Sequence, residues 1–115
     1  MPRFVWDLAR AHVLAMERFD DILAQENGGS PAYRVINLGT ENGVTVKEFV
    51  TAFEEVLGKS IAKEETTPRP GDGAGAYASS ERARQLMGWT CEKTLEEGIA
   101  DALAWDEKRK TILGY

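Results

Sequence analysis

Arg69 and Asp72, in the stretch PRPGD, are the residues of this sequence whose types and spacing best suit ligand chemistry. Pro68 and Pro70 restrict the backbone on both sides of Arg69, and Gly71 permits a turn and the close approach of a ligand. A guanidinium offers a planar fork of donors that matches phosphate oxygens, and an ionised aspartate is an acceptor suited to paired sugar hydroxyls. The alternative is a surface turn closed by an Arg–Asp ion pair worth under about 1 kcal/mol, which the spacing alone slightly favours.

The other reactive residue types are better explained as structural. His12 lies beside the apolar stripe of a helical stretch, without a partner for nucleophilic catalysis. Cys91 follows Trp89 and is interpreted as a small packing residue. No Cys/His cluster has metal-ligand spacing, so we assign neither a catalytic residue nor a metal ligand.

The stretch NLGTENG, residues 37–43, places glycines between a predicted strand and a predicted helix, where a phosphate could bind. Glu41 argues against this, because its carboxylate would repel an anion at the helix N-terminus. The sequence also lacks the G-x-G-x-x-G and P-loop motifs. We therefore expect no dinucleotide site in this chain.

Composition sets the class of protein. The 115 residues carry a net charge of -5 and are 43% hydrophobic, which fits one globular domain spanning 1–115. The acidic balance disfavours nucleic-acid or anionic-membrane partners, and no apolar run approaches the roughly 18 residues of a membrane span. The single cysteine and the absence of a signal-peptide pattern lead us to expect a cytoplasmic protein.

The elements that must position the PRPGD loop alternate between helical and extended patterns. Apolar spacing predicts a first helix over 8–26, with Asp7 as its N-cap and residues 27–31 as its stop. AYRVINLG, residues 32–39, predicts a buried strand, and SIAKEET, residues 60–66, predicts a second strand exposed on one side.

Capping signals predict the remaining three helices. Thr45 and Glu48 form a capping box, with Gly58 at the helix end. Ser79 and Ser80 are candidate caps of a short helix that ends at Gly88, with Trp89 packed back onto it. Another box, of Thr94 and Glu97, opens a final helix that ends before Gly114. The resulting α-β-α-β-α-α order predicts a mixed α/β fold, rich in helix and with too few strands for a complete doubly wound sheet.

Five stretches together resemble the C-terminal part of the UDP-glucose 4-epimerases, which are extended short-chain dehydrogenases/reductases that use NAD. They occur in one order and cover nearly all of the chain from Asp7 to Trp105: DLARAHVLAM (7–16), YRVINLGTENGVTVKEFVTAFEEVLGK (33–59), PRPGD (68–72), SSERARQLMGW (79–89) and TLEEGIADALAW (94–105). The resemblance implies the small substrate-binding lobe that accompanies a Rossmann domain in that family.

By this resemblance, Arg69 matches the arginine that binds the UDP diphosphate and Asp72 the aspartate that binds the uridine ribose. The run Gly73, Ala74, Gly75 and Ala76 matches the stretch that lines the sugar pocket. The complete family enzyme is an isomerase of galactose metabolism that interconverts UDP-glucose and UDP-galactose with NAD.

This sequence lacks the motifs that carry out catalysis in the family. No dinucleotide fingerprint is present, and neither Tyr33 nor Tyr77 is followed four residues later by a lysine, so the Tyr-x-x-x-Lys pair is missing. Glu41 stands where the family often has glycine. Hydride transfer needs a bound nicotinamide and a catalytic tyrosine, so we expect this chain to be inactive alone and to bind UDP weakly.

Two alternatives stay open. The chain could be an assembly module that complements a separate Rossmann subunit or pairs with itself. It could also be the lobe of another nucleotide-sugar enzyme, such as a 4,6-dehydratase or a decarboxylase, since short motifs discriminate poorly between relatives.

Overall fold

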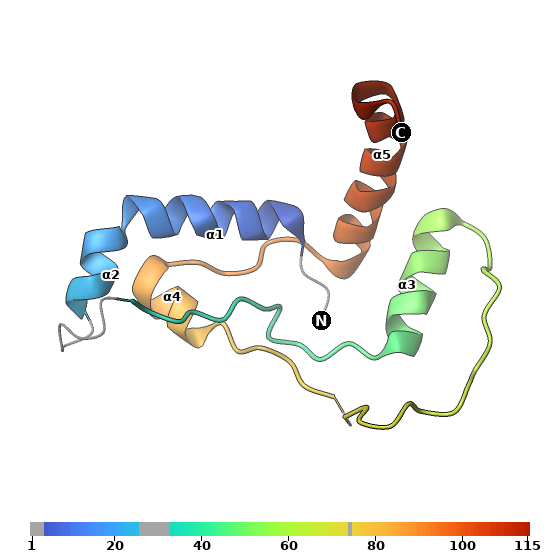
Figure 1. Cartoon of the computed structure of the whole chain (residues 1–115), viewed down its shortest axis with the longest axis horizontal. Coiled ribbons are helices and arrows are strands. Elements are labelled where there is room, and N and C mark those ends of the chain that lie inside the picture. Colours follow the sequence, from blue (N-terminus) through green and yellow to red (C-terminus); the bar gives the residue numbers. More distant parts are fainter. Residues whose placement is uncertain (1–3, 26–32, 74) are drawn as a thin grey trace. The chain divides into compact units, whose positions relative to one another are not determined.

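The computed structural model describes residues 4–25, 33–73 and 75–115. Within them the chain forms five helices, shown in Figure 1: α1 (Val5–Glu17), α2 (Phe19–Gln25), α3 (Val46–Leu57), α4 (Glu81–Met87) and α5 (Leu95–Leu113). They belong to two compact units: Met1–Gly43 with Tyr77–Lys93, and Val44–Ala76 with Thr94–Tyr115.

The first unit packs α1, α2 and α4 around one apolar cluster. Its buried members come from α1, α2, α4 and the residue that follows Gly88: Ala11, Ile22, Ala83, Leu86, Met87 and Trp89. Ile36 and Leu38, from the extended segment that runs alongside α1, pack against the same cluster (Figure 1). Small residues at Ala11 and Ala83 let the helices approach closely. Trp89 packs back onto α4 as predicted: its backbone N–H donates to the Ala83 carbonyl oxygen at 3.3 Å, and the residue lies in the same cluster.

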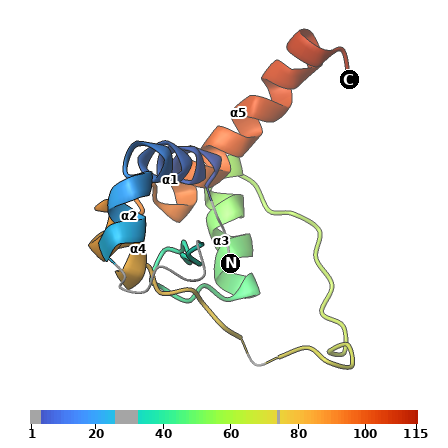
Figure 2. The same cartoon turned by 60° about the vertical axis from the view of Figure 1, so that its left-hand side comes forward.

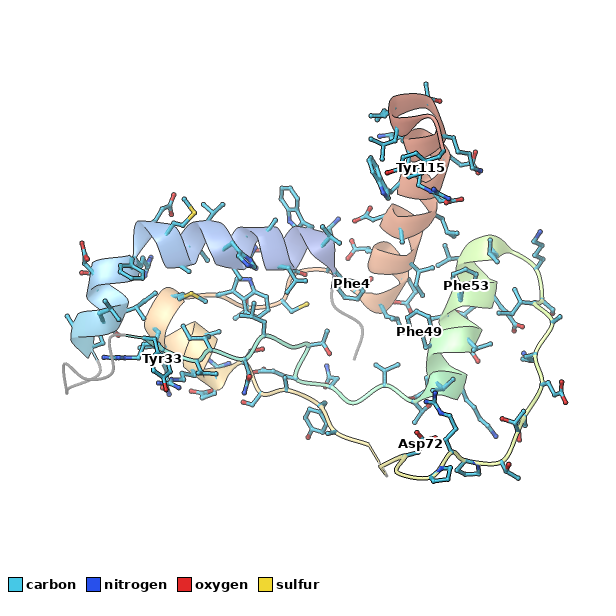
Figure 3. All side chains as sticks on the ribbon, in the orientation of Figure 1. Phe4, Tyr33, Phe49, Phe53, Asp72 and Tyr115 are labelled. Atoms are coloured by element: carbon cyan, nitrogen blue, oxygen red, sulfur yellow. The ribbon has the colours of Figure 1, made fainter. Side chains whose placement is uncertain are left out.

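The second unit pairs α3 with α5. Ala52 and Ile99 are its most buried residues, and Phe49 and Phe53 lie on the side of α3 that faces α5 (Figure 3). The coil that follows α3 is held to it by Glu54, whose Oε1 accepts from the Ile61 backbone N–H at 3.1 Å and from Lys63 Nζ at 2.8 Å.

The predicted helix ends are confirmed for α3, α4 and α5. Both capping boxes form, Thr45 with Glu48 and Thr94 with Glu97, each with its two reciprocal hydrogen bonds. The C-terminal glycines of these three helices take the left-handed conformation that glycine adopts at little cost: Gly58, Gly88 and Gly114.

The first helix differs from the prediction in two ways. Phe4, not Asp7, occupies the N-cap position, and the helix breaks at Arg18 into α1 and α2. The break follows no glycine or proline, so it arises from packing: α2 contacts α4 and buries Ile22 in the shared cluster. The predicted stop at 27–31 lies outside the described residues.

The two predicted strands do not form among the described residues, so the mixed α/β class and the α-β-α-β-α-α order are not realised there, while the helix-rich small lobe is confirmed. The physical reason is the lack of a pairing partner, since a strand exists only through its ladder. Side chains take the place of ladder bonds: Arg82 and Ser80 bond the backbone of 33–39, and Glu54 bonds that of 60–66.

None of the helices in the described parts of the chain is both long and apolar enough to span a bilayer.

Candidate nucleotide-binding loop

Arg69, Pro70, Gly71 and Asp72 form a closed turn. The Asp72 backbone N–H donates to the Arg69 carbonyl oxygen at 3.1 Å, and Gly71 has a φ of +91°. Proline at the second position and a glycine with positive φ at the third are the signature of a type II turn. The sequence thus sets the local geometry at the predicted ligand contact.

The Asp72 carboxylate stabilises this turn through two contacts with Arg69. Its Oδ2 accepts from the Arg69 backbone N–H at 3.0 Å, and its Oδ1 lies 3.4 Å from Arg69 Nη2. The Arg69 side chain is nevertheless 87% exposed, so most of its donors face solvent. The predicted pair is therefore brought together, and each partner must loosen the contact with the other to bind a ligand fully.

The loop around this turn is open. Every described residue from 62 to 77 is exposed, and in Figure 2 the coil leading to the turn stands clear of α3. Figure 3 labels Asp72 on this coil. Gly73, Gly75 and Ala76 are exposed, Gly75 with a φ of +121°, and Ala74 lies outside the described residues. The described residues of this run are therefore open to solvent.

A polar cluster around Asp7 is the main feature that sequence reasoning missed. Asp7 is 2% exposed, and its carboxylate accepts from the backbone N–H groups of Glu92 at 3.1 Å and Lys93 at 3.0 Å. Arg10 Nη2 lies 3.3 Å from Asp7 Oδ1. Burial acts to raise the pKa of Asp7, but these hydrogen bonds, with that from the Cys91 thiol, outweigh it and hold the pKa below its ordinary value.

Cys91 and Trp89 are fixed by the same residue. The Cys91 thiol lies 3.2 Å from Asp7 Oδ2, and the Trp89 indole N–H donates to the Asp7 carbonyl oxygen at 3.0 Å. Burial and the neighbouring Asp7 carboxylate raise the pKa of Cys91 to about 11, so its thiol stays protonated at neutral pH. Cys91 is confirmed as a packing residue, and Asp7 fastens the start of α1 to residues 89–93.

The glycine loop at 39–43 serves the fold and does not fit a dinucleotide. A Cβ on Gly39 would lie 2.6 Å from the Ala78 carbonyl oxygen, and one on Gly43 would lie 3.3 Å from the Tyr77 ring. The close approaches that these glycines allow are thus occupied by the chain itself. Glu41, at a φ of +60°, adds a carboxylate that disfavours a pyrophosphate. This glycine loop therefore lacks the open cradle that a pyrophosphate needs.

His12 has a local hydrogen bond. Its Nδ1 lies 2.6 Å from the Leu8 carbonyl oxygen one turn earlier, and the residue is exposed. The contact is within α1 and links His12 to no nucleophile.

Comparison with known proteins shows which proteins this chain is similar to. No protein-family model matches the chain. It is 40% identical over 111 residues to the UDP-glucose 4-epimerase of Bacillus subtilis, covering 96% of this chain and 30% of that protein. It is 42% identical over 102 residues to the UDP-glucose 4-epimerase of Corynebacterium glutamicum, covering 88% of this chain and 28% of the relative.

The fold agrees with these matches. The crystal structure of UDP-glucose 4-epimerase from Bifidobacterium longum in complex with NAD+ and UDP superposes with a TM-score of 0.73 at 34% identity, over 89% of this chain and 28% of that one. In sequence and fold the chain is therefore similar to one part of the UDP-glucose 4-epimerases, consistent with their C-terminal lobe. The relatives in question are UDP-glucose 4-epimerases, and this chain spans between 27% and 30% of the length of those compared by sequence.

Proposed function

We propose that this chain is the nucleotide-sugar-binding part of a UDP-glucose 4-epimerase-like protein. Arg69 binds the diphosphate of UDP, Asp72 binds the ribose, and the run 73–76 borders the hexose. The observation that carries the proposal is the type II turn, which holds Asp72 beside Arg69 while leaving the guanidinium 87% exposed. A rigid turn presenting an exposed planar fork suits a diphosphate, because little conformational freedom is lost on binding.

The chemistry of the complete protein belongs to residues outside this chain. Interconversion of UDP-glucose and UDP-galactose proceeds there with NAD, in a Rossmann part with its own tyrosine and lysine. The 115-residue chain alone is inactive, and the open loop binds UDP weakly because half of the pocket wall is absent. When the Rossmann part is present, the segments 32–39 and 60–66 form the strands of a small α/β lobe over 1–115. The whole protein works in the cytoplasm.

Titration calorimetry with UDP tests the proposal on the wild-type chain and on Arg69→Ala. Saturable binding that the substitution weakens by more than about 1.5 kcal/mol is expected, because a charge-assisted contact to phosphate is lost. Arg109→Ala is the matched control: Arg109 also pairs with an aspartate three residues away, Asp106, but lies on α5. Equal weakening by both substitutions, or UDP binding unchanged by Arg69→Ala, contradicts the assignment.

Titration calorimetry with different nucleotide sugars tests which nucleotide the chain binds. A deoxythymidine-diphosphate sugar that binds better than its UDP counterpart would assign the lobe to another nucleotide-sugar enzyme. Similarity to UDP-glucose 4-epimerases over 88–96% of the chain favours UDP.

One observation favours an assembly role beside ligand binding. The side of α1 opposite the cluster is apolar as well, and four of its residues are more than half exposed: Val5, Trp6, Val13 and Met16. A helix that is apolar on two sides is normally covered on both. Light scattering that shows a strict monomer without affinity for a hydrophobic dye would remove this second role.

A further inference from the structure

Asn42 and Gly43, in the loop before α3, are residue types that can react with each other. The carboxamide carbon of an asparagine lies within reach of the backbone nitrogen of the next residue. That nitrogen is a weak nucleophile, and the side chain of its own residue normally hinders its approach. Gly43 has no side chain, so the attack is least hindered at this pair.

Both reacting groups are open to solvent and free of other contacts. Asn42 and Gly43 are exposed. Within residues 4–25, 33–73 and 75–115, no group forms a hydrogen bond with the Asn42 carboxamide or with the Gly43 N–H. The attack therefore breaks no existing contact of these two groups and needs only a rotation within an exposed loop.

A neighbouring hydroxyl activates the attacking nitrogen. Thr40 Oγ1 donates to the Asn42 carbonyl oxygen at 3.1 Å. This carbonyl group and the Gly43 N–H belong to one peptide group, so a hydrogen bond to the oxygen draws electron density from the nitrogen. The proton of the Gly43 N–H is then easier to remove, and the deprotonated nitrogen is the stronger nucleophile.

Two similar positions in the chain lack this combination. Asn37 is also exposed, but it precedes Leu38, whose side chain hinders the approach to the backbone nitrogen. Asp72 also precedes a glycine, but its carboxylate accepts from the Arg69 backbone N–H at 3.0 Å. An ionised carboxylate is moreover a poor target for a nucleophile. Asn42 alone of these three residues joins a free carboxamide to an unhindered nitrogen.

We propose that Asn42 is a site of spontaneous deamidation in the folded chain, promoted by the Thr40 hydroxyl. The Gly43 nitrogen attacks Asn42 Cγ, a C–N bond forms, and the side-chain nitrogen leaves as ammonia with the proton that the Gly43 nitrogen gives up. Water then opens the resulting succinimide ring at either of its two carbonyl carbons. One opening yields aspartate, and the other yields isoaspartate, whose main chain runs through the former side chain.

The reaction changes the loop in charge and in length. Both products add a negative charge beside Glu41, in a chain whose net charge is already -5. Isoaspartate also lengthens the main chain by one carbon atom. Gly43 lies close to Tyr77, because a Cβ at this glycine would be 3.3 Å from the Tyr77 ring. The longer main chain of isoaspartate therefore displaces Gly43 from this ring.

Peptide mapping by mass spectrometry tests the proposal on the 115-residue chain, incubated at pH 8 in water enriched in heavy oxygen. Residue 42 should take up heavy oxygen and appear as both aspartate and isoaspartate, while Asn37 stays unchanged. Asn27 also precedes a glycine in the sequence, so Asn27→Gln is used as the background. The incubation lasts until residue 42 has converted in the urea-unfolded chain. An intact Asn42 in the folded chain at that time overturns the proposal.

Variants of the loop test the mechanism. Gly43→Ala should slow the conversion about 10-fold, equivalent to about 1.4 kcal/mol in the barrier, because its methyl group hinders the nitrogen. Thr40→Val should slow it about 3-fold, because the activating hydrogen bond is lost. Thr51→Val should not, although it also removes a hydroxyl bonded to a carbonyl oxygen.

The products keep the test decisive even if Gly43→Ala does not fold. Only the succinimide gives isoaspartate, whereas direct hydrolysis of the carboxamide gives aspartate alone. Aspartate as the single product, or an unchanged rate in a folded Gly43→Ala variant, overturns the attack by the Gly43 nitrogen. An unchanged rate in Thr40→Val overturns the role of the Thr40 hydroxyl.

Discussion

The Ser80 hydroxyl binds both backbone groups of Gly39, accepting from its N–H at 2.9 Å and donating to its carbonyl oxygen at 2.6 Å. Ser80 stands at the N-cap position of α4 but makes no side-chain cap bond there, and the exposed Ser79 accepts from the Glu81 N–H at 3.3 Å instead. One serine thus joins α4 to a segment 41 residues away, and its neighbour serves the helix end.

Ser80→Ala should lower the free energy of unfolding by about 1–3 kcal/mol, because it leaves a buried N–H and a buried carbonyl group unsatisfied. Ser79→Ala should cost about 1 kcal/mol or less, as an exposed cap does. Urea unfolding of both variants measures the difference. A larger loss for Ser79→Ala than for Ser80→Ala would show that the buried bonds are not formed.

Asp7 should make the free energy of unfolding fall at acidic pH. Because its folded pKa lies below the ordinary value of 3.8, its contribution is fully present above that value and is lost as the pH falls through the folded pKa. Asp7→Asn should lower the free energy of unfolding at pH 7 by about 1.5–3 kcal/mol, since hydrogen bonds to a charged acceptor are lost.

The free energy of unfolding, measured by urea between pH 7 and pH 2, checks this. The difference between wild type and Asp7→Asn should shrink below pH 3.8, where the wild-type carboxylate also becomes neutral. Asp20→Asn, at an exposed position of α2, is the control and should change stability by no more than about 0.5 kcal/mol. A constant difference across the range would mean that the charge of Asp7 is not what holds residues 92 and 93.

Cys91 should react slowly with thiol reagents. A pKa raised from 9.0 to about 11 leaves about 100-fold less thiolate at a given pH below 9. The rate of reaction with a chromogenic disulfide at pH 8 should therefore rise by about that factor when the chain is unfolded in urea. Equal rates in the folded and unfolded chain would contradict the contact with Asp7.

Glu41→Gly should stabilise the chain by about 0.5–1 kcal/mol, because Glu41 adopts a φ of +60° that costs a side-chain-bearing residue energy and glycine almost none. Its ion pair with Arg84, at 3.9 Å between two half-exposed side chains, contributes little. Glu41→Gln removes the charge but keeps the strained conformation and should leave the melting temperature unchanged. Stabilisation by glutamine as large as by glycine would locate the cost in the charge instead.

The strands show where sequence reasoning was incomplete. The sequence predicts a buried strand at 32–39, whereas residues 33–39 form an extended segment with only one covered face. A ladder also needs a second chain segment at the right distance. Among the described residues, the side chains of Arg82 and Ser80 bond the backbone along one edge of the segment, and no strand pairs with the other edge. Periodicity reports which face of a segment is buried and carries no information on its hydrogen-bonding partner.

Asp7 shows the same limit at a single residue. An aspartate before an apolar helical stretch is a reasonable N-cap, yet the acceptor is used by backbone N–H groups 85 and 86 residues further along the chain. The sequence indicates packing roles for Cys91 and Trp89, but nothing in their spacing links them to Asp7.

By itself, the sequence determined the features whose bonding partners lie only a few residues apart along the chain. Both capping boxes, the three left-handed glycines and the Arg69–Asp72 turn follow from local types and spacing, because their bonds close over about three to six residues. Only the tertiary structure decided the break at Arg18, the clamp of Asp7 on residues 92 and 93, and the bond of Ser80 to Gly39. Those depend on which unsatisfied backbone groups folding brings together, and that is a property of the packed chain.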